Sequence, residues 1–542
     1  MYLFEVPEKS PYVFLLFLVA LVSLASIGSS FLFIDDLSLI VNNPKLVFSL
    51  NEIAAVFSKP LGQIYDAADY QTKFIYYRPA LNLLYMFNNG LWGINPVGFH
   101  ITNLFLHLLT SILIYRSGLV LFNSDKTFSL LGASLFCVHP AHNELIGRVA
   151  MNENLLGLFI ALSLYYYLLE KKYLSLLFLA IALLSKESAV MLPFALCLFE
   201  MRSMSFRKAV LSLKPYIVLV ICYLVVRTLV VGITDGAMIN PDGLLIFCSA
   251  TVDYLRLLLV PYPLNIYYPV LNSAAFLKQD YLAIISSCFL LLLVAWRLRS
   301  DKVLFPLLAG TFIMLAPVVY KTNELVIGLD RAYIAERQLY VPSIFFSLFI
   351  AGMLFRYAGP LSRKIAVPSL YAVVFVFSYT TARASTVWAK DETVNSRFSH
   401  DFPENLHSHK YRGQTLLDRG DRDGALAELK AALPSRKSSG PEHNSLRNTI
   451  GKGSNGLDAM LQHYDIAAYQ SEYAEVHFLI GEVYLAKGDV SKAMTKYRTA
   501  LILAPKSISW RARLAEVYRK NGLSREAQRE FRLVMNDINQ KR

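Results

Sequence analysis

Charged residues are scarce in this chain, and that scarcity excludes most soluble folds. Asp, Glu, Lys and Arg make up 17% of the 542 residues, whereas hydrophobic residues make up 55% and the mean hydropathy is +0.41. An average soluble protein carries about 25% charged residues. Most of the chain is therefore predicted to lie in lipid, and the 13% aromatic content fits helices whose ends lie at membrane interfaces.

Several motifs of soluble chemistry are also missing. The five cysteines all lie inside apolar stretches without a Cys-x-x-Cys pair, so they are interpreted as small hydrophobic side chains. No Gly-x-Ser-x-Gly or P-loop pattern is present, which disfavours a soluble-type nucleophilic enzyme. The formal charge of +13 does not indicate nucleic-acid binding, because no recognition module is visible and much of the basic excess lies in short links.

Twelve apolar segments follow one another before the polar C-terminal part. One of them, 244–260, carries Asp253 and Arg256 in its middle and is predicted to be interfacial or re-entrant. A spanning helix needs about 20 apolar residues, and two of the remaining segments are shorter than that. The eleven predicted spans are 11–34, 100–122, 127–145, 151–169, 173–185, 188–200, 215–233, 281–298, 303–320, 339–356 and 365–383.

Short basic links between the segments predict their orientation. The positive-inside rule assigns four such links to the cytoplasmic side, so an even number of crossings is required between Lys214 and Arg297. With the N-terminus inside, the loop after the first span, the loops 139–150 and 321–338 and the whole C-terminal tail are expected on the outer face. The four basic links are 170–172, 202–208, 297–302 and 356–364.

The polar C-terminal part contains a repeat. Gly413, Gly481 and Ala515 occupy equivalent places, 68 and 34 residues apart, and other residues recur at fixed distances after each of them. This is the pattern of tetratricopeptide (TPR) repeats, helical hairpins that stack into a solenoid with a concave binding face. The glycine-rich window 440–473 is predicted to be a degenerate repeat or a spacer. The residues in register are Leu416, Tyr484 and Tyr518; Gly420, Gly488 and Gly522; Ala425, Ala493 and Ala527; and Leu429, Tyr497 and Phe531.

Two adjacent carboxylates follow the first predicted span. Asp35 and Asp36 lie at the membrane border, where acidic side chains are costly unless they are exposed, paired or used. A solvated helix end is the plain interpretation. The functional interpretation is a general base, which would work together with cations that stabilise a departing anion. The cations expected on the same face are Arg78, Arg148, Lys186, Arg331 and Arg337. Each of them could instead anchor a helix end at the interface.

A His-x-x-His-x-Glu sequence ends another apolar segment, at His139, His142 and Glu144. Such residues can bind a metal, but Pro140 breaks regular helical spacing, so hydrogen bonding at the interface or substrate contact is preferred. No metal site is predicted, and no cofactor is certain, although a divalent cation stays open.

These residues belong to five short motifs that occur in a fixed order before the repeats. Each motif alone is weak, whereas the ordered set on one predicted face is specific. The motifs are Phe33-Ile34-Asp35-Asp36; Tyr77-Arg78-Pro79 followed by Asn95-Pro96-Val97-Gly98-Phe99-His100; His139-Pro140-Ala141-His142-Asn143-Glu144; Ser185-Lys186-Glu187; and Ala335-Glu336-Arg337-Gln338-Leu339-Tyr340-Val341-Pro342.

With these motifs the chain resembles the transmembrane and TPR-containing O-mannosyltransferases and their prokaryotic relatives, within the GT-C class of polytopic glycosyltransferases. The resemblance covers nearly the whole chain. It implies an all-α fold: a polytopic transmembrane helical bundle of GT-C type with about 11 spans at 1–383, a linker at 384–405 and a TPR α-solenoid at 406–542. A compact tail with few repeats favours a prokaryotic relative over the animal enzymes.

The resemblance also implies the chemistry. It implies transfer of a sugar from a polyprenyl or dolichyl phosphate to a hydroxyl, with inversion at the anomeric carbon and an acidic residue of the first outer loop as the base. Asp36 is assigned as that base, and Asp35 is expected to support it or to bind an acceptor or ion. Arg78, Lys186 and Arg337 are candidates for binding the donor phosphate, and His139, His142 and Glu187 are candidates for lining the substrate pocket.

The expected partners are the lipid-linked sugar, membrane lipid, and a protein acceptor or assembly partner bound by the TPR tail. Ser or Thr of exported proteins is the preferred acceptor. The same chemistry on a glycan or lipid-linked saccharide stays open, as does a non-catalytic scaffold or transporter in envelope assembly. The expected location is a bacterial or archaeal cytoplasmic membrane with the tail on the outer face, or an ER membrane with a luminal tail in a eukaryote.

Overall fold

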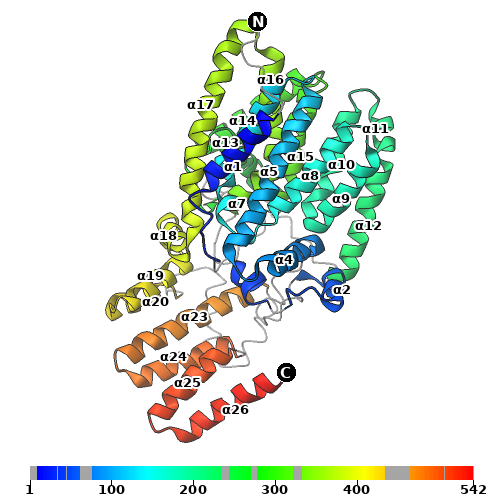
Figure 1. The fold of residues 1–542 in the computed structure, drawn as a ribbon. Helices are drawn as coiled ribbons and strands as arrows, with labels where there is room; N and C mark the ends of the chain where they lie inside the picture. Colours follow the sequence, from blue (N-terminus) through cyan, green and yellow to red (C-terminus); the bar gives the residue numbers. More distant parts are fainter. Residues whose placement is uncertain are drawn as a thin grey trace. The chain divides into compact units, whose positions relative to one another are not determined.

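The computed structural model describes most of the chain and divides it into two compact units. The first unit runs to Val394 and the second begins at Asn395. Each unit is described by itself (Figure 1). The described residues are 9–32, 35–43, 45–61, 76–232, 243–269, 278–321, 333–433, 464–505 and 507–540.

All twelve predicted apolar segments, the eleven spans and the interfacial or re-entrant segment 244–260, form helices in the first unit. The only strands among the described residues are β1 (Tyr268–Pro269) and β2 (Tyr333–Ile334), which pair with each other. The all-α prediction is therefore confirmed. The helices are α1 (Ser10–Ser23), α5 (Pro96–Leu121), α6 (Lys126–Cys137), α8 (Glu153–Leu168), α9 (Lys172–Ser185), α10 (Leu192–Glu200), α12 (Lys214–Val231), α13 (Gly243–Leu259), α14 (Lys278–Leu298), α15 (Leu304–Lys321), α16 (Tyr340–Tyr357) and α17 (Pro360–Ser385).

Shorter helices connect these segments and lie near the bundle ends. Several begin where a proline or a side-chain cap fixes the first turn, as at Ser49, whose hydroxyl accepts from the Glu52 N–H. The connecting helices are the π-helix η1 (Leu37–Val41), α2 (Leu50–Ser58), α4 (Pro79–Trp92), α7 (Asn143–Gly147) and α11 (Phe206–Ser212), with the 3₁₀ turns η2 (Pro140–His142), η3 (Glu187–Met191), η5 (Glu336–Leu339) and η6 (Thr386–Ala389).

Helix length and composition identify a membrane protein. By these two criteria fewer helices are long enough to span the membrane than the sequence predicts. Four helices among the described residues are long and apolar enough to cross a membrane, against the eleven spans predicted. Six further apolar helices are shorter, among them α6, α8 and α9. The four long helices are Pro96–Leu121, Lys214–Val231, Glu336–Tyr357 and Pro360–Ala389.

The outward faces of the bundle are apolar, as lipid contact requires. Leu229 on α12, Leu292 on α14 and Phe375 on α17 are largely exposed, which would be costly in water. The inward faces pack closely: a Cβ on Gly132 of α6 would lie 3.2 Å from the Ala351 Cβ on α16. The exposed hydrophobic faces are therefore read as lipid-facing.

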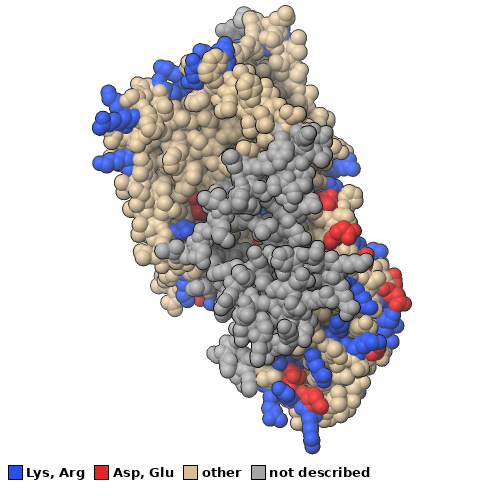
Figure 2. Space-filling model, turned by 180° about the vertical axis from the view of Figure 1, so that it is seen from behind, with Lys and Arg blue, Asp and Glu red and all other residues tan. Residues whose placement is uncertain are grey.

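The four basic links lie at one end of the bundle. Lys172 Nζ lies 3.4 Å from Glu200 Oε1, and Arg356 Nε lies 3.5 Å from Asp301 Oδ2. Asp301 also interacts electrostatically with Arg202. Figure 1 shows the α10–α11 and α16–α17 connections at the same end, and Figure 2 shows Lys and Arg gathered there beside an uncharged surface. We call this the basic end.

The two shortest predicted spans form a hairpin instead of one continuous helix. Helix α9 stops at Ser185, because Lys186 has an extended backbone, and α10 starts after the η3 turn. The contact between Lys172 at the start of α9 and Glu200 at the end of α10 brings these two helix ends together at the basic end. The chain therefore reverses at Lys186 and Glu187, far from the basic end.

The second unit consists of helical hairpins with the predicted repeat register. A Cβ on Gly413 would lie 2.6 Å from Leu429 Cγ, and one on Gly481 would lie 2.7 Å from Tyr497 Cε1, so each glycine lets its helix approach the next one. Gly420 turns the first hairpin with φ of +84°, which favours glycine. The hairpins are α19 (Leu406–Asp418) with α20 (Arg422–Ala431), α23 (Tyr464–Ala486) with α24 (Val490–Leu503), and α25 (Ile508–Lys520) with α26 (Ser524–Gln540).

Two predicted boundaries fall in helical or undescribed parts of the chain. Of the proposed degenerate window 440–473, residues 440–463 lie outside the described residues, and the last ten form the start of α23. The expected linker at 384–405 contains the end of α17, η6 and helix α18 (Asp391–Asp401). The change between compact units falls inside α18.

Candidate functional site

The two carboxylates after the first span occupy different environments. Asp36 is 0% exposed, and its two oxygens accept hydrogen bonds from the Leu32 N–H at 2.9 Å and the Ala150 N–H at 2.8 Å. The Asp35 side chain is 39% exposed, and its φ of +66° is uncommon for a residue with a side chain. Burial raises the pKa of Asp36 from 3.8 to about 6, although Arg148 and the two backbone donors oppose the shift.

A buried guanidinium joins Asp35 to a second carboxylate. Arg148 Nη2 lies 3.1 Å from Asp35 Oδ2, and Arg148 Nη1 lies 2.6 Å from Glu144 Oε1. Burial acts against the charged guanidinium, but Glu144, Asp35 and Asp36 together hold the pKa of Arg148 above its ordinary value. Arg148 therefore fixes the distance between two acidic groups from different loops.

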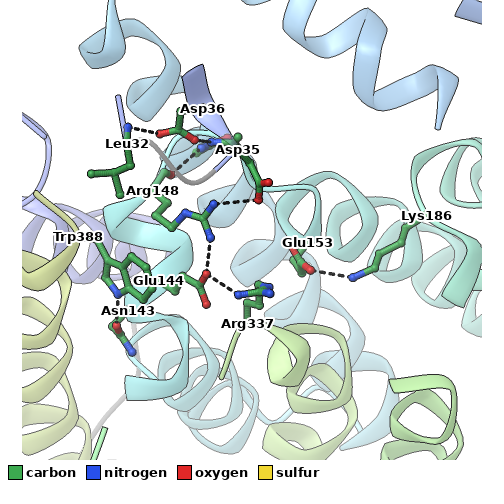
Figure 3. A network of polar contacts seen from close by, with 12 residues as sticks. Leu32, Asp35, Asp36, Asn143, Glu144, Arg148, Glu153, Lys186, Arg337 and Trp388 are labelled. Carbon is green, nitrogen blue, oxygen red and sulfur yellow. Dashed lines mark hydrogen bonds and ion pairs between the residues drawn. The ribbon is translucent and has the colours of Figure 1, made fainter. Parts of the chain in front are cut away.

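Glu144 is shared by two arginines. Arg337 Nη1 lies 2.8 Å from the same Glu144 Oε1 that accepts from Arg148 (Figure 3). The other oxygen, Oε2, is buried and has no hydrogen-bond partner among the described residues. Arg337 is 23% exposed, whereas Arg148 is buried, so Arg337 is the outer of the two cations.

Two further predicted cations, Lys186 and Arg78, are also ion-paired, and Arg331 lies outside the described residues. Lys186 Nζ lies 2.7 Å from Glu153 Oε1 at the start of α8 and 3.3 Å from Gln338 Oε1. Arg78 forms a two-pronged pair with Glu187, at 3.1 Å and 2.7 Å. All the cations predicted to bind phosphate thus lie in one network, far from the basic end, because α9 and α16 each run from that network to a basic link. Figure 3 shows most of this polar network. Its members are Asp35, Asp36, Glu144, Arg148, Glu153, Lys186 and Arg337, together with the pair of Arg78 and Glu187, in which Arg78 interacts electrostatically with Glu153.

A second layer of hydrogen bonds holds the network in place. Tyr268 and Asn143 both donate to the buried Glu336, whose Oε1 also accepts from the Asn265 N–H at 3.1 Å. Asn143 in turn accepts from Trp388 Nε1 at 2.7 Å. These bonds tie α7, β1 and η6 to the turn that carries Arg337.

The two histidines predicted to line the pocket are packed in the protein interior. His139 accepts from the Ala141 N–H at 3.2 Å through Nδ1, so its Nε2–H donates to the Leu258 carbonyl at 3.1 Å. His142 Nε2 lies 3.0 Å from Ser343 Oγ, and its ring centroid lies 4.8 Å from that of Tyr340. In the described part of the chain no group of three His, Cys, Asp or Glu residues is arranged to hold a metal.

The sequence predicts most members of the network but not their pairings. Asp35, Asp36, Arg78, Lys186 and Arg337 come together as expected, and the predicted pocket residue Glu187 pairs with Arg78. Glu153 and Glu336 were not selected, although a buried carboxylate between apolar runs requires a partner. The sequence places Arg148 among the cations of this face and Glu144 in the His-x-x-His-x-Glu pattern, and their i, i+4 spacing is the signal that predicts their pairing.

The network can perform acid–base chemistry next to a developing anion. Asp35 offers a partly exposed carboxylate oriented by a fixed arginine, which suits proton abstraction. Arg337 offers a cation that can change partners, because Glu144 remains paired with Arg148.

Comparison with known proteins agrees with both parts of this description. The tetratricopeptide repeat family model matches residues 474–507, which confirms a TPR repeat in this part of the tail. The chain is 24% identical over 425 residues to a protein O-mannosyl-transferase of Caenorhabditis elegans, covering 73% of this chain and 58% of that protein. It is 34% identical over 166 residues to protein O-mannosyl-transferase TMTC4 of Homo sapiens, covering 27% of this chain and 21% of that protein. The chain thus covers less than two thirds of the length of each of these relatives.

Proposed function

We propose that this protein is a glycosyltransferase that moves a sugar from a polyprenyl or dolichyl phosphate to a hydroxyl of a protein, with inversion at the anomeric carbon. The observation that carries the proposal is the polar network, in which a partly exposed carboxylate and an exchangeable arginine meet at one end of an apolar bundle. The names of the similar proteins support a protein acceptor and make mannose the first sugar to test.

Within the carboxylate pair, the geometry favours Asp35 over Asp36 as the base. Both Asp36 oxygens already accept backbone hydrogen bonds, and the side chain is fully buried. A general base must reach the proton that it removes, and the exposed Asp35 carboxylate meets that requirement. Asp36 then acts as a positioning residue, because it ties the first loop to the Ala150 backbone beside Arg148.

At the anomeric carbon one bond forms and one breaks, and a proton passes from the acceptor hydroxyl to the base. Asp35 takes the proton of an acceptor Ser or Thr hydroxyl. The oxygen of that hydroxyl forms a bond to the anomeric carbon at the same time. The bond from that carbon to the phosphate oxygen breaks, and the lipid phosphate leaves with the electron pair. Arg337 stabilises the charge on the leaving phosphate, since it can release Glu144 without leaving that carboxylate unpaired.

We infer a GT-C-type bundle of eleven crossings with the polar network and the TPR tail on the outer face. The helix in each of the eleven predicted segments and the gathering of the basic links at one end support this topology. Helix α13 is the segment left out of the crossings. The TPR hairpins would then hold the acceptor protein or an assembly partner on the same side as the network.

The test compares cells that carry the wild-type chain, Asp35→Asn or Asp36→Asn at matched membrane levels, with glycan mass spectrometry of exported proteins and of lipids. Loss of one sugar from proteins in Asp35→Asn is the expected result. Loss from a lipid or polysaccharide instead would replace the acceptor, and unchanged glycans in both variants would reject the transferase in favour of a scaffold.

A further inference from the structure

Two of the three described hairpins in the second unit hold a carboxylate against a basic side chain at the same place in the repeat. In the first hairpin, His409 Nδ1 of α19 lies 2.7 Å from Glu428 Oε2 of α20. In the third, Arg511 Nη1 of α25 lies 2.8 Å from Glu530 Oε2 of α26. Both pairs join residues 19 positions apart, so each links the same two positions of its hairpin.

The middle hairpin has a lysine where the other two have a glutamate. In the repeat register the equivalent residues are His477 of α23 and Lys496 of α24. His477 is 5% exposed, and its buried Nδ1 has no hydrogen-bond partner in the part of the chain that the structure describes. In the first hairpin, Nδ1 is the atom with which His409 contacts Glu428. A buried polar atom without a partner destabilises a protein, so the middle hairpin lacks an acidic group that its neighbours supply.

A second lysine adds to the positive charge at this place. Lys430, in the last turn of α20, interacts electrostatically with the partly buried Lys496, which in turn interacts with His477. Burial and the charge of Lys430 lower the pKa of Lys496, and burial and the charge of Lys496 lower the pKa of His477 to about 4. Neither lysine forms an ion pair with another described residue. We call these three side chains the lysine site, and Figure 1 shows the helices that carry them, α20, α23 and α24, packed in sequence order.

From these contacts we infer that the lysine site binds a carboxylate of a partner protein, an Asp or Glu side chain in an acidic segment. The glutamates of the other two hairpins show which group this place in the repeat accommodates. A carboxylate bound between Lys430 and Lys496 removes their repulsion and accepts charge-assisted hydrogen bonds from both. The small planar group of the neighbouring hairpins favours a carboxylate over a phosphate.

The inference gives the TPR hairpins a partner of stated chemistry. It rests on their proposed role in holding a protein, but not on the transfer reaction, because binding can be measured without a sugar donor. A chain that transfers sugar but binds no acidic segment would keep the proposed transferase and reject this inference.

The test measures the binding of a fluorescein-labelled oligoglutamate peptide to the full chain in nanodiscs of uncharged lipid, by fluorescence anisotropy. Lys496→Glu supplies the carboxylate that the other two hairpins carry, so this variant should fold. It should bind the peptide about tenfold to a hundredfold more weakly than wild type, as expected when a charge-assisted hydrogen bond is lost. Arg525→Glu makes the same change of charge at an exposed position of α26 and is the matched control, with an affinity close to that of wild type.

Hydrogen exchange measured by mass spectrometry locates the effect. The peptide should slow exchange in α23 and α24 of wild type, and Lys496→Glu should show the slower exchange without peptide. No binding by wild type, equal binding by wild type and Lys496→Glu, or equal loss in Arg525→Glu would overturn the inference. Slower exchange with inorganic phosphate or with nanodiscs of anionic lipid, but not with the peptide, would also overturn it and would assign the site to a phosphate.

Discussion

The cations of the polar network carry the same charge but would leave different groups behind if removed. Glu144 keeps Arg148 when Arg337 leaves, whereas Glu153 is buried and loses its direct ion pair when Lys186 leaves. A buried carboxylate without a partner destabilises a protein by about 3–5 kcal/mol. Arg337 and Lys186 should therefore separate function from stability.

Arg337→Ala should lower kcat/KM for the lipid-linked donor about tenfold to a hundredfold, the value of a charge-assisted hydrogen bond, with little change in thermal midpoint. Lys186→Ala should instead lower the midpoint in detergent, and Glu153→Gln added to Lys186→Met should restore much of it. Equal loss of stability in Arg337→Ala and Lys186→Ala would contradict this division of roles.

The raised pKa of Asp36 predicts that the stability of the protein depends on pH. Its pKa is raised from 3.8 to about 6 by burial, so the folded state favours the protonated form. The stability from this proton is fully present below about pH 4 and is lost as pH rises through about 6, a change of about 3 kcal/mol. The thermal midpoint of wild type should fall relative to that of Asp36→Asn between pH 4 and pH 7. A constant difference between the two would show that Asp36 does not titrate there.

Sequence patterns located these residues, but they could not rank them. The pair at Asp35 and Asp36 is symmetrical in sequence, and only the left-handed backbone at Asp35 and the hydrogen bonds from Leu32 and Ala150 make one acid exposed and the other buried. Similarly, the sequence predicts that His139 and His142 line the pocket. In the structure their hydrogen bonds to Leu258 and Ser343 hold them in the protein interior.

At the scale of elements, the repeat register makes a sharp prediction about Gly481. Gly481→Ala would place a Cβ 2.7 Å from Tyr497, and overpacking of this kind costs about 1–3 kcal/mol. Hydrogen exchange measured by mass spectrometry should show faster exchange in α23 and α24, with α5 unchanged. Thr495→Ala, on an exposed position of α24, is the matched control and should leave exchange in both helices as in wild type.

Hydrophobic periodicity predicted most elements because each depends on local sequence. The apolar segments all became helices, and the hairpins of the tail kept the expected phase. The short elements η2, α7, β1 and β2 were not predicted, because their positions depend on contacts between distant segments. Asn143 and Glu336, for example, are hydrogen-bonded although 193 positions separate them in the chain.

For the whole molecule, the proposed topology predicts where added protease can act. In sealed cells stripped of their wall, protease outside should cleave the TPR tail and spare an epitope placed in the 202–208 link. Membrane permeabilisation should expose that epitope. A tail that is protected until permeabilisation would reverse the orientation and place the polar network on the cytoplasmic side.

The α9–α10 hairpin has a consequence for the surrounding membrane. Helix α9 has 14 residues and rises about 21 Å, whereas a typical hydrocarbon layer is about 30 Å thick. Tyr173, Leu177 and Phe194 are exposed on this hairpin, so lipid must meet its short side directly. Hydrophobic mismatch of this size is relieved by local thinning at a fraction of a kcal/mol per Å. The protein should accordingly prefer thin bilayers. A thin bilayer brings the lipid headgroups closer to Lys186 and Glu187 at the turn of the hairpin.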